Sequence, residues 1–265
     1  MFRLSLLLAA LLGYVLAILV PGSERRGVEP LLRDLSRPLV LPSLWASLEE
    51  SQDSGRYGET AAKGRVLMRY LPGWVDGSLY FAWLLASPRP GREETPQASL
   101  GRLLAALQWL DQAVADLNPE NPSKAAEILL AQAFFVEVRT VQDPRLETAL
   151  KAEVGHGSAE VAAGYVDRAI ALAPSQAKAD RRIMLYPKLI AGALRMGNRQ
   201  RAIDLIETAL DKFQQVSDRG LAVAWSNSLR RFRAFLDGDL GMSLQDLAED
   251  PYLSDIIQAY RAGQN

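Results

Sequence analysis

GSAEVAAGYVDRAIALAP, residues 157–174, is the stretch that decides the fold of this 265-residue chain. Ala162, Val166 and Ala169 lie four and three residues apart, a spacing that puts their side chains on one face of an α-helix. A glycine opens the stretch and a proline closes it, and both residue types are typical of the breaks between helices. The pattern therefore predicts one short helix bounded by turns.

The same periodicity extends over nearly all of the remaining chain. Leu103, Leu107 and Leu110, for example, share a helix face, and no convincing alternation of polar and apolar residues is present. The stretch FFVEV at 134–138 comes nearest to a strand, but it ends an alanine- and leucine-rich helical pattern and is predicted as helix. Proline and glycine breakers divide the chain into helices of about 10 to 18 residues. The predicted class is all-α.

Two stretches share one pattern of small and large apolar residues. A glycine is followed after five residues by alanine, after four more by a large apolar residue, after three more by alanine and after five more by proline. The first stretch matches in full and the second has Gln214 in place of the proline, the residues being Gly157, Ala162, Val166, Ala169 and Pro174, then Gly197, Ala202, Ile206 and Ala209. This pattern resembles the tetratricopeptide repeat, although the two units are 40 residues apart against about 34 in that family.

The resemblance implies an α-α superhelix of helical hairpins over residues 43–215, with a generic α-helical bundle as the alternative. Residues 216–265 are predicted to be capping helices, because the end of a repeat array needs a partly polar outer face. In the resembling family the first helix of each pair lines a concave groove that holds a peptide. On that basis Lys151, Lys188 and Arg195 are candidate binding residues for an acidic peptide or a C-terminal carboxylate.

The N-terminal residues suggest a membrane anchor. Residues 4–20, LSLLLAALLGYVLAILV, carry no charge and as a helix would span roughly 25 Å of a hydrocarbon core about 30 Å thick. We expect residues 1–21 to be a single-pass anchor and the proline-rich residues 22–42 to be a juxtamembrane linker with a short helix. A cleaved signal peptide and a buried core helix are the alternatives. The positive-inside count of Arg25, Arg26, Arg33 and Arg37 after the run favours a cytoplasmic location for the rest of the chain. A short basic tail before an apolar run is typical of a signal-anchor and favours an extracytoplasmic location, which is the location we expect.

Composition excludes several function classes. Thirty Lys and Arg against 31 Asp and Glu give a net charge of -1, which disfavours nucleic acid as a partner because its binding needs a basic excess. There is no cysteine, so disulfides, thiol catalysis and iron–sulfur clusters are excluded. The single histidine, His156, lies in a predicted turn and cannot form a multi-histidine metal site. We therefore expect neither a metal nor another cofactor.

No GxxxxGK[ST], GxGxxG, HExxH or GxSxG motif is present. We therefore expect no catalytic residue, and the predicted function is that of a membrane-anchored scaffold for a protein or peptide partner. One alternative is an exported α-helical enzyme with a pocket near Trp74, Trp83 and Trp109. Another is a structural subunit of a larger membrane complex, in which Ala9 and Gly13 would allow close helix contact.

Overall fold

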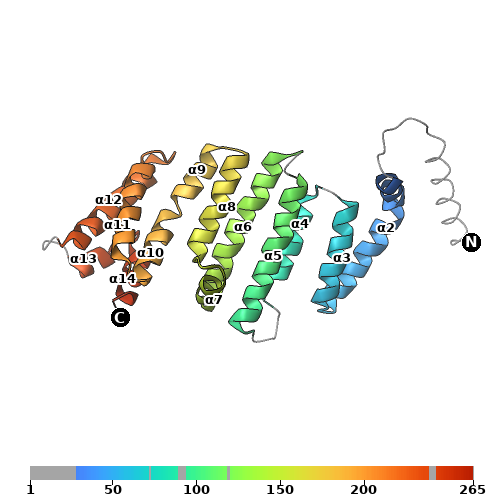
Figure 1. Cartoon of the computed structure of the whole chain (residues 1–265), viewed down its shortest axis with the longest axis horizontal. Coiled ribbons are helices and arrows are strands. Elements are labelled where there is room, and N and C mark those ends of the chain that lie inside the picture. The colour runs from blue at the N-terminus through green and yellow to red at the C-terminus, as the bar shows by residue number, and fades with distance from the viewer. Residues whose placement is uncertain (1–27, 72, 89–93, 118–119, 239–242, 265) are drawn as a thin grey trace, which may run out of the picture. The chain divides into compact units, whose positions relative to one another are not determined.

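The computed structural model is helical throughout the part of the chain that it describes (Figure 1). No strand occurs in these ranges, so the all-α prediction is confirmed for them. The chain divides into two compact units between Phe81 and Ala82, and each unit is described by itself. The described residues are 28–71, 73–88, 94–117, 120–238 and 243–264.

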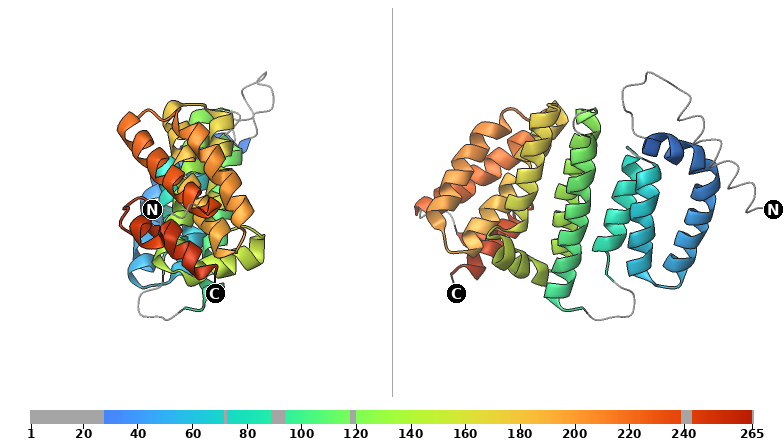
Figure 2. Two further views of the ribbon diagram at one scale, coloured as in Figure 1. Left: turned by 90° about the vertical axis from the view of Figure 1, so that its left-hand side faces the viewer. Right: turned by 45° about the vertical axis from the view of Figure 1, so that its right-hand side comes forward.

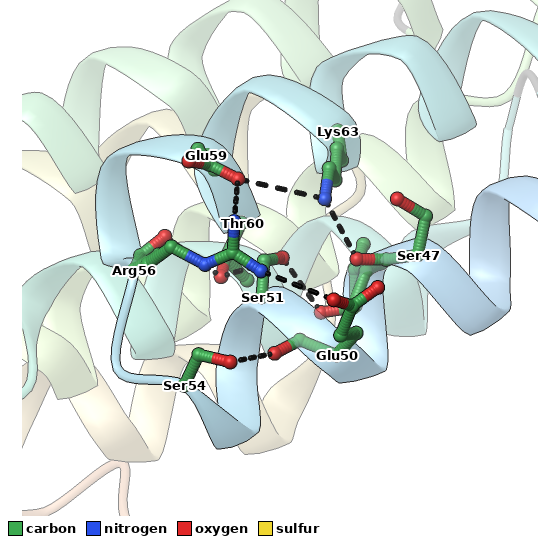
Figure 3. A network of polar contacts seen from close by, with 9 residues as sticks. Ser47, Glu50, Ser51, Ser54, Arg56, Glu59, Thr60 and Lys63 are labelled. Carbon is green, nitrogen blue, oxygen red and sulfur yellow. Dashed lines mark hydrogen bonds and ion pairs between the residues drawn. The ribbon is translucent and has the colours of Figure 1, made fainter.

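The first unit is built around a helical hairpin of α2 (Val28–Asp53) and α3 (Tyr57–Tyr70). Gly55, whose φ of 68° suits glycine, lies in the turn between the two helices. Polar contacts tie the hairpin together near this turn (Figure 3). The Lys63 ammonium donates to the Ser47 carbonyl at 2.8 Å, and the Arg56 guanidinium lies 3.4 Å from the Glu50 carboxylate of α2.

Residues 28–42, the described part of the expected linker, belong to a helix that is longer than the short one expected there. Pro38 and Pro42 both lie inside α2, so the expected boundary at residue 42 falls within this helix. Proline removes a backbone donor and usually bends a helix at the turn before it. Accordingly, α2 changes direction sharply along its length (Figure 2). Both prolines are exposed.

The second unit contains long helices that run alternately up and down, as Figure 1 shows for α5, α6 and α8. The most extensive contact of the unit joins α6 to α8, and α6 also packs along α5. After the last residues of α4 (Val75–Ala86), the helices are α5 (Pro96–Leu117), α6 (Pro122–Gln142), α7 (Arg145–Val154), α8 (Ser158–Leu172), α9 (Gln176–Ile183), α10 (Tyr186–Arg195), α11 (Arg199–Phe213), α12 (Arg219–Asp237), α13 (Leu244–Ala248) and α14 (Ser254–Ala262).

Local sequence explains where these helices begin and end. Pro187 lies in the first turn of α10, where its missing amide proton costs no helical hydrogen bond, and the chain breaks before it at residues 184–185. Gly155 and Gly238 end α7 and α12 in the left-handed conformation. Several helices start with a side chain that accepts a hydrogen bond from a first-turn amide: Asn121, Ser175, Asn198, Asp218 and Ser243.

One of these caps yields a simple prediction. The Asn198 side chain accepts from the Arg201 amide at 3.0 Å, and Asn198→Ala leaves that amide without its partner. We expect the free energy of unfolding to fall by about 1 kcal/mol, as measured by urea denaturation. Gln200→Ala, in the first turn of the same helix and exposed, is the control and should change stability by less than about 0.5 kcal/mol. Equal effects from the two variants would contradict the capping role.

The C-terminal helices share a core with the helices before them. A single cluster of buried apolar side chains draws on α9 to α14, including Ile206 and Phe213 of α11, Phe232 of α12 and Ile256 of α14. The expected boundary at 215–216 therefore lies within one hydrophobic core. The terminal helices α12 to α14 share this core with α9 to α11.

Candidate functional site

A buried carboxylate joins three helices in the second unit. Glu137 of α6 is only 5% exposed, although it is an acidic residue. Its carboxylate receives a hydrogen bond from the Arg181 guanidinium of α9 and another from the Lys188 ammonium of α10, the latter at 2.5 Å. Arg181 and Lys188 are themselves about half exposed. Two cations at the surface thus neutralise one carboxylate below them, as a buried charge requires.

Other polar side chains of α6 are buried and serve its packing against α5. The Gln132 amide donates to the Leu107 carbonyl at 3.0 Å. The Arg139 guanidinium donates to the Ser99 hydroxyl at 3.1 Å, and burial lowers the pKa of Arg139. Because its position in the last turn places a cation near the negative end of the helix dipole, Arg139 is favoured there.

Towards the C-terminal end of α6, its remaining side is open and apolar. Phe134 and Val141 are 51% and 74% exposed, and Val138, which lies between them, is partly exposed. At 100° per residue these three side chains fall on one arc of the helix, next to the direction of Glu137. On the opposite border Trp83 of α4 packs against Phe135, with ring centroids 5.4 Å apart. We call Phe134, Val138 and Val141 the α6 face.

The three predicted basic residues are placed on two helices. Lys188 and Arg195 lie two turns apart on α10, and both are exposed, whereas Lys151 lies exposed on α7. Lys188 is held by Glu137 and is thereby linked to Arg181. Glu137 and Arg181 were not among the predicted residues. A glutamate inside the apolar run FFVEV was the available signal for Glu137.

The three tryptophans of the enzyme alternative belong to different units. Trp74 lies in the first unit and pairs with Trp45 at a centroid distance of 6.0 Å. Trp83 and Trp109 lie in the second unit, where Trp109 is partly buried on α5. A pocket is found elsewhere, between α12 and α13, with a volume of about 400 Å³. Its lining includes the ion pair of Arg231 with Asp250, whose closest atoms are 3.3 Å apart.

Metal-ligating side chains do not gather at any one place in the described ranges. No set of three or more His, Asp and Glu side chains able to hold a metal ion is found among those residues. His156 is exposed in the turn before α8, and its Nδ1 lies 3.7 Å from the Glu160 carboxylate. His156 and Glu160 are thus two neighbouring side chains that are both exposed to solvent.

The pKa of a second acidic residue, Asp180, can be tested by mutation of its hydrogen-bond partner. The hydroxyl of Ser217 donates to the Asp180 carboxylate, and the side-chain amide of Gln176 donates to it as well. These hydrogen bonds, that of Ser217 being the stronger influence, hold the pKa of Asp180 below its ordinary value of 3.8. We expect Ser217→Ala to move the pKa of Asp180 towards 3.8, as read from the carboxyl ¹³C shift. Thr208→Ala, whose hydroxyl bonds a backbone carbonyl, should leave the pKa of Asp180 unchanged.

The sign of the accompanying stability change follows from the direction of the shift. Because the folded-state pKa of Asp180 is lowered, its stabilisation is fully present above the unfolded-state pKa and is lost as the pH falls through the folded-state pKa. The variant should therefore be less stable than the parent at pH 6, and the difference should shrink in acid. A difference that grows in acid would contradict this assignment.

The expected membrane span at residues 4–20 lies outside the described residues. Within residues 28–264, as far as they are described, none of the helices combines the length and the apolar character that a bilayer crossing needs. Neither a family model, a curated protein nor a solved structure matches the chain.

Proposed function

We propose that this protein is a membrane-anchored, non-enzymatic scaffold whose helical repeats bind a protein or peptide partner. One observation carries the proposal. The corresponding positions of the two repeat units are all completely buried, each with 0% exposure: Ala162, Val166 and Ala169 in α8, and Ala202, Ile206 and Ala209 in α11. Burial of the same small and large residues in both units supports tetratricopeptide-like packing, since small side chains let paired helices approach closely.

The irregular period has a structural explanation within this proposal. The helix paired most extensively with α8 is α6, and the short α7 is inserted between them in the chain. The helix before α11 is likewise divided into α9 and α10. Only the division into α9 and α10 falls between the two units, where it lengthens the connection from α8 to α11 and leaves the buried alanine positions in place.

The proposed binding surface is basic and takes an acidic peptide or a C-terminal carboxylate, through Lys151, Lys188 and Arg195. Lys188 also neutralises Glu137, so reversing its charge would disturb folding as well as binding. Lys151→Glu with Arg195→Glu avoids that problem because both residues are exposed. We expect this pair of changes to weaken partner binding about tenfold or more, with an unchanged circular dichroism spectrum.

Crosslinking followed by mass spectrometry on membranes that contain the full chain tests the proposal. We expect one reproducible protein partner whose crosslinks are lost in the Lys151→Glu, Arg195→Glu variant. A matched variant, Arg199→Glu with Arg201→Glu, reverses two exposed charges on α11 and should keep the crosslinks. The scaffold proposal fails if no partner is crosslinked, or if the parent chain turns over a substrate without one.

The proposed anchor and its direction have their own test. The chain lacks cysteine, so one introduced thiol at exposed Gln200 reports the side of the membrane that it occupies. We expect the chain to resist extraction at alkaline pH and the Gln200→Cys thiol to react with an impermeant maleimide added from outside. Extraction into the alkaline wash would refute the anchor, and labelling only after lysis would refute the extracytoplasmic location.

A further inference from the structure

We infer that the α6 face, together with Arg181 and Lys188, is the docking surface for a peptide segment that combines an apolar anchor with carboxylates. The inference rests on the proposed scaffold function and specifies the chemistry of the partner and the surface that binds it. It differs from the sequence-based expectation in two ways. It centres the contact on α6 instead of on α7 and α10, and it adds an apolar component that a purely basic surface lacks.

The apolar component comes from the part of α6 that its neighbours leave uncovered. Most of α6 is buried, yet Phe134 and Val141 remain about half and three-quarters exposed. These two residues are seven apart, which corresponds to about 10.5 Å along the helix. Trp83, 37% exposed, extends the apolar surface on the α4 side. Neighbouring apolar side chains left exposed together are typical of interaction surfaces.

The charged component identifies the occupant. Arg181 and Lys188 border the α6 face on the side of Glu137, and together they carry two positive charges against one buried carboxylate. Glu137 lies almost completely buried below them, so the half-exposed cations dominate the outer surface. Glu127, the exposed acidic residue of α6, lies about two turns towards the N-terminus from Phe134. Charge complementarity therefore selects carboxylates next to the apolar anchor.

Glu137 has a definite role in this arrangement. Two cations side by side repel each other and would spread into solvent, but a carboxylate shared between them holds both at the edge of the α6 face. A ligand carboxylate then meets donors that are already positioned, which lowers the entropy cost of binding. Glu137 is thus a positioning residue for Arg181 and Lys188.

Random twelve-residue peptides displayed on phage and selected on the detergent-solubilised full chain test the inference. We expect enrichment of peptides that pair Asp or Glu with Phe, Leu, Ile or Trp. The best peptide, synthesised with a fluorophore, should bind in an anisotropy assay, and changing its carboxylates to amides should weaken binding about tenfold or more. Phe134→Ser with Val141→Ser in the protein should weaken binding by a similar factor.

The control is a pair of exposed apolar residues elsewhere, Met196→Ser with Val223→Ser, which should bind the peptide like the parent. Thermal unfolding of each variant shows that lost binding is not lost folding. Enrichment of peptides without carboxylates, or binding that survives Phe134→Ser with Val141→Ser, overturns this inference and leaves the scaffold proposal intact. If no peptide is enriched and crosslinking finds no partner, the scaffold proposal fails with it.

Discussion

Replacing Arg181 and Lys188 together by methionine is expected to lower the free energy of unfolding by about 3 kcal/mol. Methionine keeps most of the apolar stem of each side chain, so Glu137 stays covered. Its carboxylate, 5% exposed in the parent, then has neither of the two cations that neutralise it. A buried charge without a partner lowers the free energy of unfolding by far more than an exposed ion pair raises it. We therefore expect a large effect from Arg181 and Lys188, although both are half exposed.

Adding Glu137→Met to that variant should restore most of the lost stability. The triple variant contains no buried charge, and apolar replacements of buried ion pairs are often neutral or stabilising. Urea denaturation of the parent, double and triple variants measures the three stabilities. Arg199→Met with Arg201→Met, two exposed cations in the first turn of α11, is the control and should be close to neutral. An equal loss in the double and triple variants would show that Glu137 is not the cause.

Gly263→Ala is expected to lower the free energy of unfolding by about 2 kcal/mol. A Cβ added at Gly263, just after α14, would lie 2.0 Å from the backbone carbonyl oxygen of Leu194 in α10. Neither group is the end of a flexible side chain, so α14 has to move away from α10. The shift would open the core that Ile256 and Ile257 of α14 share with Ile190. Amide hydrogen exchange should therefore speed up in α14 more than in α5 or α6.

Gly192→Ala on α10 is the matched control. A Cβ at that position has no atom within 4 Å to meet, and alanine is the better helix former by up to about 1 kcal/mol. We therefore expect this variant to be as stable as the parent or slightly more so. Loss of stability at both glycines would point to α10 itself, whereas no loss at Gly263 would show that α14 adapts without cost.

The all-α class was predictable because the spacing of apolar residues repeats along the whole chain. The same local rules explain why α9 ends at Ile183 and α10 starts at Tyr186, directly before Pro187. Pro38 and Pro42 show the limit of those rules. Each proline predicts a break, yet a bent helix keeps most of its hydrogen bonds when the prolines face solvent.

The ion pairs around Glu137 were beyond prediction for a different reason. Arg181 and Lys188 lie 44 and 51 residues from Glu137 along the chain, and no local pattern connects residues so far apart. Lys188 was predicted to be a binding residue from the place of its helix in the resembling repeat, while its buried partner depends on how α6, α9 and α10 pack. Ion pairs between residues of three different helices can be identified only from the folded structure.

The break between α9 and α10 also has a mechanical consequence. Arg181 precedes the break and Lys188 follows it, and both hold the same carboxylate on α6. The Glu137 carboxylate therefore connects the two helices on either side of the break at residues 184–185. A rotation of α9 relative to α10 would have to break one of the two ion pairs with Glu137. We therefore expect α9 and α10 to move together as one rigid segment.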